Sequence, residues 1–371
     1  MRVLHVSEVT TGGVLSLVRT YAVEQERRGN AAYLLASEPM GFEAARFRTW
    51  SAARRRPYAF PLAVRQLAAT ARDIGPDVIH LHSFFAGVLG RTGLGTIPRS
   101  TAVVYQPHSW SFGAVDSSAL RRAVIRIERS GAKRTDRLVA NCHEELTEGL
   151  TNGVRAPHTV LGLPLDTDFF TPLDADERAR LRARLGLDDR VVAACVGRLC
   201  RQKAQDRLVA AWEAAPVPGT VLLLVGGGDD HALRRLAPRE WGRSILAVGH
   251  QDDIRSWLRA SDLLIQASRF EGQSVAVAEA MACGLPAVVL DVNGSHETID
   301  SGSLDPAGAV VPQPDMAGLL AACGVRAADP ALRAKESQAA RDRAVAFFSI
   351  QNVMDRLDGA YADAIARAAA T

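Results

Sequence analysis

Hydrophobic and polar positions follow two alternating patterns along the whole chain. Short apolar runs, typical of strands buried on both faces, are separated by longer segments with the period of an amphipathic helix. In the first half, this pattern predicts strands near Val3–Val6, Ala32–Leu35, Val78–Leu81, Ala102–Tyr105, Leu138–Ala140 and Thr159–Leu161. It predicts helices near Val14–Arg27, Leu62–Asp73, Ala86–Leu89, Ala119–Gly131 and Glu144–Leu150.

A second series of the same kind begins after a proline-containing linker at residues 163–172. Its strands are expected near Arg190–Val196, Val221–Val225, Ser244–Val248, Asp262–Gln266 and Ala287–Leu290. The last stretch, Lys335–Ala370, is rich in alanine and indicates one or two helices. Strand–helix alternation indicates an α/β fold with parallel sheets. We therefore expect two doubly wound domains, residues 1–167 and 168–350, facing each other across a cleft.

Composition agrees with this picture and excludes some classes of protein. A chain of 371 residues is long enough for two cores, and 47% hydrophobic and 23% charged residues are ordinary for a globular protein. No apolar run approaches the roughly 18 to 20 residues that span a bilayer, and the first residues do not resemble a secretory signal. The five cysteines have no CxxC or metal-finger spacing. These features favour a cytoplasmic protein without a structural metal.

Charge is unevenly distributed, although the net charge is only +3. Basic residues exceed acidic ones over residues 1–167, and the reverse holds for the remainder. The predicted helix near 119–131 and the residues after it carry one basic face, opposite Leu120, Val124 and Ile127, made of Arg122, Arg126, Arg129, Lys133 and Arg137. Such a helix either lies on an anionic membrane or exposes its basic face to solvent while its apolar stripe packs.

Two glutamates surround the predicted start of a helix at Ser274. Glu271 lies in the loop that follows the apolar run Leu263–Ile265, and Glu279 falls in the second helical turn. In an open parallel sheet, strand ends and the adjoining helix N-termini form the ligand crevice. Free N–H groups at a helix start bind anions, and carboxylates accept hydrogen bonds from sugar hydroxyls. This segment therefore predicts a nucleotide-sugar site.

Glycines and cations follow other predicted strands. Arg198 and Lys203, in the loop after the strand near 190–196, are suited to a diphosphate, whereas two solvated surface cations are the simpler alternative. The glycine triplet from Gly226 to Gly228 also follows a strand, but any βα turn uses such residues. Gly12 and Gly13 open the first helix without a full GxGxxG motif, so they do not indicate a dinucleotide site.

Three histidines are placed at predicted strands of the first half. His108 follows the strand near 102–105 and should reach the same cleft, although a lone histidine is more often structural. His80 and His82 alternate on one strand, and a single metal held by both is conceivable. No third ligand stands nearby at the usual spacing, so structural roles are favoured.

Taken together, these motifs resemble those of family 4 glycosyltransferases of the GT-B type over nearly the whole chain. The segment with Glu271 and Glu279 is similar to the family's E-x7-E motif, and residues 282–286 to the A-x-G-x-P run that follows it. Gly197-Arg198 with Lys203 resembles the diphosphate motif. The first-half segments 80–91 and 105–108 are similar to members that build exopolysaccharide.

The resemblance implies a role for each candidate residue. Arg198 and Lys203 would neutralise the donor diphosphate, Glu279 would hold the ribose and Glu271 the donor sugar. The sugar-binding amides would be those of Gly272, Gln273 and Ser274. Contacts to the rest of the donor would come from Gly12, Gly13, Gly226 and Gln251, and His108 would lie near the transferred sugar. The catalytic set is His108, Arg198, Lys203 and Glu271. The resemblance also implies retention of anomeric configuration, no metal or other cofactor, and a C-terminal helix at about 351–371 that crosses back to the first domain.

Two departures from the family pattern concern the hinge and the donor. Residues 163–166 replace the family's Asn-Gly-Val-Asp turn, and Gln273 stands where an aromatic residue is common. The first leaves the hinge open and the second the identity of the donor sugar.

We therefore predict a retaining, metal-independent transferase that moves a sugar from a nucleotide-diphosphate donor, by default a UDP-linked hexose. The acceptor is a glycan, a lipid-linked saccharide or a natural-product aglycone. Peripheral contact with the inner face of an anionic membrane is a further hypothesis, and no nucleic-acid partner is expected. The alternatives are a nucleotide-sugar epimerase or a phosphorylase of the same architecture and a non-catalytic sugar-nucleotide-binding protein. No lysine specifically marks a phosphorylase's pyridoxal phosphate.

Overall fold

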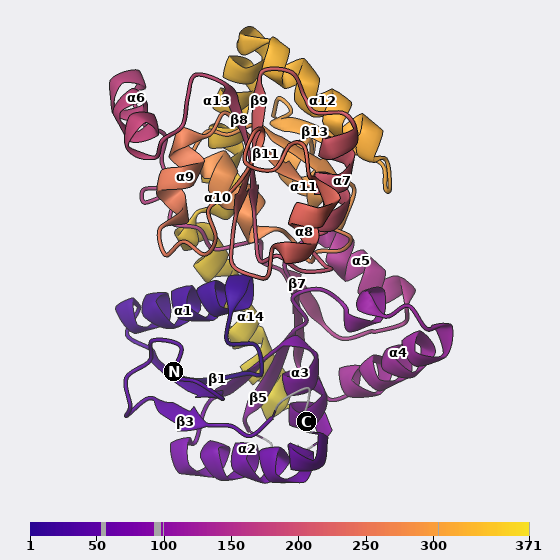
Figure 1. Cartoon of the computed structure of the whole chain (residues 1–371). Helices are drawn as coiled ribbons and strands as arrows, with labels where there is room; N and C mark the ends of the chain where they lie inside the picture. The colour runs from indigo at the N-terminus through magenta and orange to yellow at the C-terminus, as the bar shows by residue number, and fades with distance from the viewer. Residues whose placement is uncertain (53–56, 93–97, 99, 303, 371) are drawn as a thin grey trace. The chain divides into compact units, whose positions relative to one another are not determined.

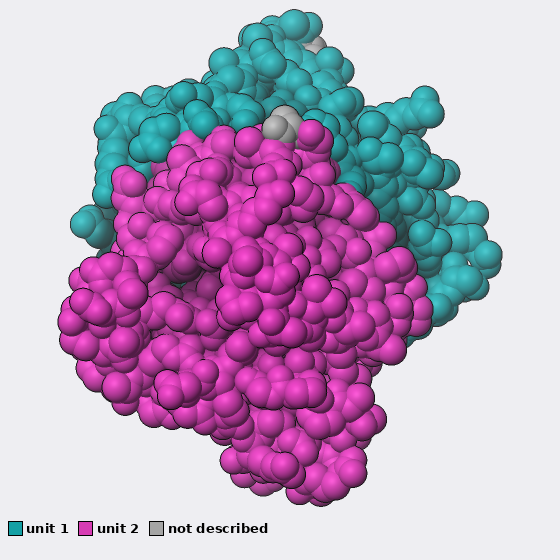
Figure 2. All heavy atoms as spheres, turned by 90° about the horizontal axis from the view of Figure 1, so that it is seen from above, with its two compact units in different colours: residues 1–164, 351–371 teal, residues 165–350 magenta. Residues whose placement is uncertain are grey.

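The computed structural model describes residues 1–52, 57–92, 98, 100–302 and 304–370. The chain forms two compact units, coloured separately in Figure 2. Unit 1 contains residues 1–164 and 351–371, and unit 2 contains residues 165–350. The division lies three residues before the position expected from the linker, because Leu165 already pairs with the end of unit 2: its amide donates to the Phe348 carbonyl at 2.8 Å.

Unit 1 is built around a parallel sheet of seven strands in the order β3-β2-β1-β4-β5-β6-β7. Figure 1 labels β1, β3, β5 and β7 of this sheet. Strand order reverses at β1, as in doubly wound nucleotide-binding folds. Runs such as Val78–His82 are buried at every position, which explains their uninterrupted apolar pattern. The strands are β1 Arg2–Ser7, β2 Ala31–Ala36, β3 Phe47–Thr49, β4 Val78–His82, β5 Ala102–Gln106, β6 Arg137–Ala140 and β7 His158–Val160.

Helices connect these strands and supply the apolar side chains that cover the sheet. Leu67 and Ala71 of one helix pack in the same core as Leu4 and Ile79 of the strands. The connecting helices are α1 Gly12–Arg27, α2 Phe60–Ile74, α3 Ser83–Thr92, α4 Ser118–Ala132 and α5 His143–Thr151. Each lies where the helical period predicts it, with ends shifted by at most three residues.

Unit 2 contains a parallel six-stranded sheet in the order β10-β9-β8-β11-β12-β13. Its core gathers Leu222, Ile265 and Val288 from the strands with Leu208 and Trp212 from a covering helix. The strands are β8 Val191–Val196, β9 Thr220–Val225, β10 Ile245–Ala247, β11 Leu263–Gln266, β12 Ala287–Leu290 and β13 Gly308–Val311. The helices before the C-terminal pair are α6 Ala175–Arg184, α7 Gln205–Ala214, α8 His231–Leu236, α9 Ile254–Ala260, α10 Val275–Ala282, α11 Ser295–Ile299 and α12 Met316–Ala328.

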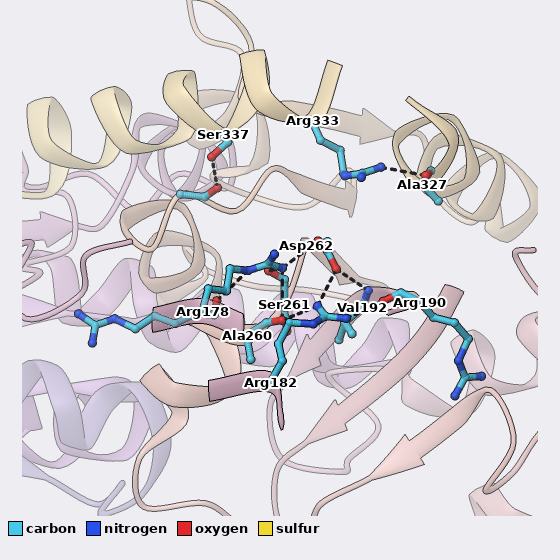
Figure 3. Close-up of polar contacts among 12 residues, drawn as sticks. Arg178, Arg182, Arg190, Val192, Ala260, Ser261, Asp262, Ala327, Arg333 and Ser337 are labelled. Atoms are coloured by element: carbon cyan, nitrogen blue, oxygen red, sulfur yellow. Dashed lines mark hydrogen bonds and ion pairs between the residues drawn. The ribbon is translucent and has the colours of Figure 1, made fainter. Parts of the chain in front are cut away.

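Two arginines of α6 bind Asp262, just before β11, and carbonyls at the end of α9 (Figure 3). Arg178 and Arg182 both contact the Asp262 carboxylate, at 2.8 Å and 3.1 Å, and donate to carbonyls at the C-terminus of α9. Asp262 in turn accepts the amide of Val192 at 2.8 Å. Because helix carbonyls are unpaired in the last turn, these guanidinium groups satisfy them and fix the positions of β8 and β11.

The alanine-rich end of the chain forms two helices, α13 Pro330–Phe348 and α14 Ile350–Ala369. Nearly all of α14 belongs to unit 1, since residues 351–371 pack there. Its buried face consists of Val353, Met354, Leu357, Ala360, Tyr361, Ala364 and Ala368. Arg28 of unit 1 holds the exposed side through Asp355 and Asp358 at 2.6 Å and 2.9 Å. Unit 1 is therefore assembled from both ends of the chain.

None of the described helices is both long enough and apolar enough to cross a membrane.

Candidate active site

The centre of the candidate site in unit 2 is an ion pair between two loops. Lys203, in the turn between β8 and α7, places its ammonium nitrogen 2.7 Å from Oε1 of Glu271, which lies between β11 and α10. Their side chains are only 19% and 7% exposed. The two residues are 68 positions apart in sequence, and they meet because β8 and β11 are neighbours in the sheet. Two of the predicted site residues thus lie in contact at the strand ends, and their roles stay a prediction.

Polar groups hold the Glu271 carboxylate in place from several directions. Ser268 and Gln266 donate to its Oε1 at 2.7 Å and 3.0 Å, and Gln202 donates to its Oε2 at 3.2 Å. The side-chain amide oxygen of Gln266 accepts a hydrogen bond from the Ser274 hydroxyl at 2.9 Å. This bond links the network to the N-cap of α10. The sequence analysis missed Gln202, Gln266 and Ser268. Their only signal was a polar side chain at the end of an apolar strand or in the following loop.

Glu279, the second acidic residue of the site, has a different environment from Glu271. Burial raises its pKa to about 8, and the nearby positive charge of Lys203 opposes this shift. Within the described part of the chain, no side chain donates a hydrogen bond to it. A buried carboxyl without donors is poorly satisfied, so Glu279 is suited to accept hydrogen bonds from a ligand's hydroxyl groups.

Close packing of two turns explains the glycines at the ends of β8 and β9. Gly226 has φ of +155°, and a Cβ at this position would lie 2.1 Å from the Gly197 carbonyl oxygen. Leu199 donates its amide to the Gly227 carbonyl at 2.9 Å, which joins the same two turns. Arg198 belongs to the turn after β8, between Gly197 and Leu199. Its side chain is exposed and forms no ion pair among the described residues. The guanidinium is therefore available to an anion.

The remaining predicted donor residues of unit 2 lie in neighbouring loops. Gln273 is buried, donates to the Thr298 hydroxyl at 3.1 Å, and leaves its amide oxygen without a described partner. Gln251 is held by the Val248 carbonyl and by Trp257 Nε1, at 2.7 Å and 3.0 Å. Gly272 immediately precedes Gln273 in the loop that leads to α10.

A pocket of about 290 Å³, including the open solvent at its mouth, adjoins this region. It lies at the ends of β11 and β12, where α10 and α11 begin. The residues that line it are Gln266, Ser268, Ser274, Val277, Val289, Leu290, Val292, Asn293, Gly294, Ser295, Thr298 and Ile299. Unit 2 therefore contains a hollow beside the Glu271 network at the position where parallel sheets bind ligands.

In unit 1, Gly12 and Gly13 form the first turn of α1. Gly12 has φ of +67°, a conformation that glycine adopts without strain, and Thr11 precedes it as the N-cap. The first amides of α1 have no partners within the helix, so the turn is suited to an anion.

His108 lies in a strained turn immediately after β5. His108 and Ser109 have positive φ values of +54° and +99°, which non-glycine residues rarely adopt. Glu145 of α5 stabilises the turn: its carboxylate accepts the Ser109 amide at 2.5 Å, and its carbonyl accepts Trp110 Nε1 at 2.6 Å. Burial lowers the pKa of His108 to about 3, so the imidazole is neutral at pH 7.

A third histidine joins His80 and His82, and sequence spacing could not reveal it. His5 on β1 is the direct neighbour of His80 on β4, and their rings are 5.6 Å apart. All three side chains are fully buried, and each can place a ring nitrogen within 4.8 Å of the others. Nδ1 of His5 lies 2.9 Å from Nε2 of His82, a hydrogen-bond separation.

The basic helix α4 differs in part from its predicted packing. Val124 is buried, but Leu120 and Ile127 are 53% and 42% exposed. The buried face instead passes through Val124, Glu128 and Ala132, because Glu128 pairs with the buried Arg91 at 2.7 Å. The expectation that the whole apolar stripe packs is therefore wrong. Two large apolar side chains remain on the surface of the helix that carries the exposed Arg122 and Arg126.

The two Rossmann-like units are those of the GT-B fold, and two family models identify the chain as a glycosyltransferase. Residues 11–169 match the model described as glycosyltransferase family 4, and residues 190–328 match the one described as glycosyl transferases group 1. The chain belongs to glycosyltransferase family 4.

Curated relatives support this assignment. The chain is 30% identical over 339 residues to a D-inositol 3-phosphate glycosyltransferase of Geodermatophilus obscurus, covering 84% of this chain and 72% of the relative. It is 27% identical over 302 residues to the UDP-Gal:alpha-D-GlcNAc-diphosphoundecaprenol alpha-1,3-galactosyltransferase of Escherichia coli, covering 78% and 76%.

Solved structures share the fold over almost the full length. Sucrose-phosphate synthase from Thermosynechococcus elongatus superposes with a TM-score of 0.84 at 22% identity, covering 99% of each chain. Anabaena Alr3699/HepE in complex with UDP and glucose gives a TM-score of 0.80 at 20% identity, covering 97% of this chain and 98% of the other.

Proposed function

We propose that this protein transfers a sugar from a nucleotide-diphosphate donor with retention of anomeric configuration and without a metal ion. One observation carries the proposal. Lys203 and Glu271 form a largely buried contact before α10, close to the Glu279 carboxyl, which receives no hydrogen bond from a described side chain. Cation, hydroxyl acceptors and helix amides are thus concentrated in one part of unit 2. A sugar diphosphate requires these three kinds of group.

In this proposal, the residues of unit 2 divide the donor between them. Arg198 and Lys203 hold the diphosphate, which Gly226 and its neighbouring glycines allow to approach the backbone. Glu279 accepts from the ribose hydroxyls, and Glu271 from hydroxyls of the sugar. Amides of Gly272, Gln273 and Ser274 complete the sugar site, and backbone near Gln251 contacts the base. In unit 1, Gly12 and Gly13 admit the diphosphate, and His108 lies near the transferred sugar.

The environment of Glu271 argues against a role as a covalent nucleophile. Its Oε1 accepts hydrogen bonds from Lys203, Gln266 and Ser268. A carboxylate stabilised by three donors is a weak nucleophile. In the reaction we favour, the bond between C1 and the leaving phosphate oxygen breaks as an acceptor oxygen attacks C1 from the same face. The acceptor's proton passes to the leaving phosphate oxygen. Arg198 and Lys203 stabilise the charge that develops there, a task that other enzymes give to a metal.

Names of the relatives narrow the substrates that we propose. The Escherichia coli relative is named for a UDP-linked sugar and a diphosphoundecaprenol acceptor, and the Geodermatophilus obscurus relative for an inositol 3-phosphate. Both names describe phosphorylated acceptors. We favour a UDP-hexose as donor and a lipid-linked saccharide as acceptor, with the enzyme in the cytoplasm on the inner face of the membrane. The exposed apolar and basic residues of α4 support the membrane contact.

The experiment combines purified protein, a panel of UDP-, GDP- and dTDP-sugars, and short-chain polyprenyl-diphosphate saccharides as acceptors. We expect transfer from one donor, unchanged by EDTA, to give a product whose NMR coupling constants match the donor's anomeric configuration. Lys203→Ala should lower kcat/KM by about 100-fold to 1000-fold, as the loss of one charge-stabilising donor does elsewhere. Arg201→Ala, which removes an exposed cation two residues away, is the matched control and should stay within about threefold.

Three outcomes would overturn this proposal. Isomerisation of the donor sugar without an acceptor would identify an epimerase. Tight donor binding without transfer or hydrolysis, across all the acceptors, would identify a binding protein. Inversion of the anomeric centre would exclude the proposed attack of the acceptor oxygen on C1 from the same face.

A further inference from the structure

Unit 1 contains a continuous line of hydrogen-bonded side chains that ends at His108. Gln25 Oε1 lies 2.9 Å from His5 Nε2, and His5 Nδ1 lies 2.9 Å from His82 Nε2. His82 Nδ1 then lies 2.9 Å from His108 Nε2. The four residues come from α1, β1, β4 and the turn after β5, so the line crosses three neighbouring elements of the sheet.

The chemistry of one end determines where every proton in this line resides. The amide nitrogen of Gln25 donates to the Tyr361 hydroxyl at 3.3 Å, so its carbonyl oxygen faces His5 and accepts. His5 must therefore carry its proton on Nε2 and accept on Nδ1. The same argument places a proton on Nε2 of His82 and leaves its Nδ1 as an acceptor. His108 then donates from Nε2 and keeps an unprotonated Nδ1.

A side branch is consistent with this arrangement. The Tyr361 hydroxyl accepts from Gln25 and donates to Nδ1 of His80 at 2.8 Å. His80 is therefore protonated on Nε2. Burial lowers the pKa of His5 to about 4 and those of His80 and His82 well below the ordinary value, so the imidazoles remain neutral at pH 7. A neutral histidine has one donor and one acceptor, which is what the line requires.

The hydrogen-bond acceptor at the end of the line, Nδ1 of His108, has no partner among the described residues. This atom is buried. A buried polar atom left unpaired costs about 1 to 3 kcal/mol, so a donor group that reached it would be favoured. The ring itself is only half-buried, in a turn with positive φ at His108 and Ser109. An unprotonated nitrogen accepts from a hydroxyl and repels a phosphate oxygen.

We propose that Gln25, His5 and His82 are positioning residues that fix the tautomer of His108, so that its Nδ1 accepts a hydrogen bond from a substrate hydroxyl and not from a phosphate. The inference rests on the proposed function for the identity of that hydroxyl, which is one of the sugar's. The tautomer itself does not depend on it. Tyr361 orients Gln25, and therefore α14 contributes to the same line.

The test is a ¹⁵N spectrum of selectively labelled histidine in the full chain, with the His108 signals assigned from His108→Asn. In the wild type, we expect Nε2 of His108 at the shift of a protonated nitrogen and Nδ1 at that of an unprotonated one. Gln25→Met removes the acceptor at nearly constant volume and should produce a mixture of tautomers. Gln25→Glu retains an acceptor for His5 and should restore the wild-type tautomer. Tyr21→Phe, one turn earlier on α1, removes a buried hydroxyl outside the line and should change nothing.

Kinetics provide the second readout. Gln25→Met should lower kcat for sugar transfer about 10-fold to 100-fold, as the loss of a group that orients a functional histidine does elsewhere, while the KM for the donor changes by less than about threefold. Gln25→Glu and Tyr21→Phe should stay within about threefold of the wild type. A protonated Nδ1 on His108 in the wild type would overturn the inference, as would an unchanged tautomer in Gln25→Met.

A metal ion is the competing use of the same histidines. His5, His80 and His82 can bring ring nitrogens within 4.8 Å, but two of those nitrogens are 2.9 Å apart, the separation of a shared proton. Stoichiometric zinc in the purified protein, lost in His80→Gln, would replace that proton and overturn the inference. If no sugar is transferred by any variant while the tautomers change as expected, the proposed function fails and the positioning role of Gln25 stands.

Discussion

The two glutamates of the candidate site illustrate how neighbours determine the properties of identical side chains. Glu271 accepts hydrogen bonds from Lys203 and from polar side chains in two loops. Glu279 is buried without side-chain donors, and its pKa rises to about 8. Glu271 therefore already has several hydrogen-bond donors, whereas Glu279 gains most from the hydroxyl groups of a ligand.

The raised pKa of Glu279 makes stability depend on pH. Between about pH 4.5 and pH 8, the folded carboxyl keeps a proton that the unfolded one has lost, so the free energy of unfolding falls as pH rises. The contribution is at most about 1.4 kcal/mol per pH unit and levels off above pH 8. Glu279→Gln should remove it, so the variant should lose less stability than the wild type from pH 5 to pH 8.

Urea unfolding followed by tryptophan fluorescence at several pH values measures this difference. The exposed Glu26→Gln serves as the control and should follow the wild type at every pH. Parallel curves for Glu279→Gln and the wild type would contradict the assigned environment.

Sequence motifs identified Lys203, Glu271 and Glu279 as candidate site residues. They did not identify Gln266 and Ser268, whose polar side chains near Glu271 belong to no motif, or His5, whose partner His82 is adjacent only in the folded sheet. His5 and His80 are 75 positions apart and become neighbours through the pairing of β1 with β4. Hydrogen-bond networks of this kind follow from strand order, which a single sequence does not specify.

At the scale of elements, α4 exposes apolar as well as basic side chains. Leu120 and Ile127 are exposed on one side of the helix, and the exposed Arg122, Arg126 and Arg129 lie on the opposite side. A helix with an exposed apolar edge and a basic face favours an anionic lipid surface. The buried pair of Arg91 and Glu128 holds the buried side of the helix in place.

Charge reversal on α4 should weaken membrane binding without unfolding unit 1. Each basic residue near an anionic surface contributes about 1 kcal/mol, so Arg122→Glu with Arg126→Glu should lower the partition coefficient on phosphatidylglycerol-rich vesicles at least tenfold. Vesicle co-sedimentation at fixed ionic strength measures this change.

The matched control reverses two exposed arginines of α6, Arg180→Glu with Arg184→Glu. The control should bind vesicles within about threefold of the wild type. Equal losses in both double variants would indicate a general effect of net charge and would refute the specific role of α4.

Element prediction located the long apolar strands and also the three-residue edge strands β7 and β10, but it missed the other two edge strands. The patterns near 78–81 and 221–225 predicted β4 and β9 within one residue. The edge strands β3 and β13 were missed, since Phe47–Thr49 has three residues and Gly308–Val311 begins with glycine. Edge strands are covered on fewer sides, so they carry a weaker apolar signal.

At the scale of the whole molecule, the chain leaves unit 1, forms unit 2 and returns. Residues 351–371 belong to unit 1, and the buried face of α14 closes its core. Tyr361 contributes both apolar area and the hydroxyl that binds Gln25 and His80. Unit 2 contains residues 165–350 without interruption.

Deletion of residues 351–371 should therefore destabilise unit 1 and spare unit 2. Loss of seven buried side chains, several worth about 1.5 to 3 kcal/mol each, is comparable to the whole stability of an ordinary domain. Hydrogen exchange read by mass spectrometry should show β1 and β4 losing protection while β8 and β11 retain it. Equal loss of protection in both units would contradict this division.

The return of α14 also reverses the order in which a nascent chain can mature. The ribosome makes the strands of unit 1 first, but the helix that covers their histidines emerges last, after all of unit 2. During synthesis the earlier half must wait, incompletely covered, while the later half can already fold. A transcript truncated near its end would yield a folded unit 2 joined to an open sheet, a form that chaperones and proteases would recognise.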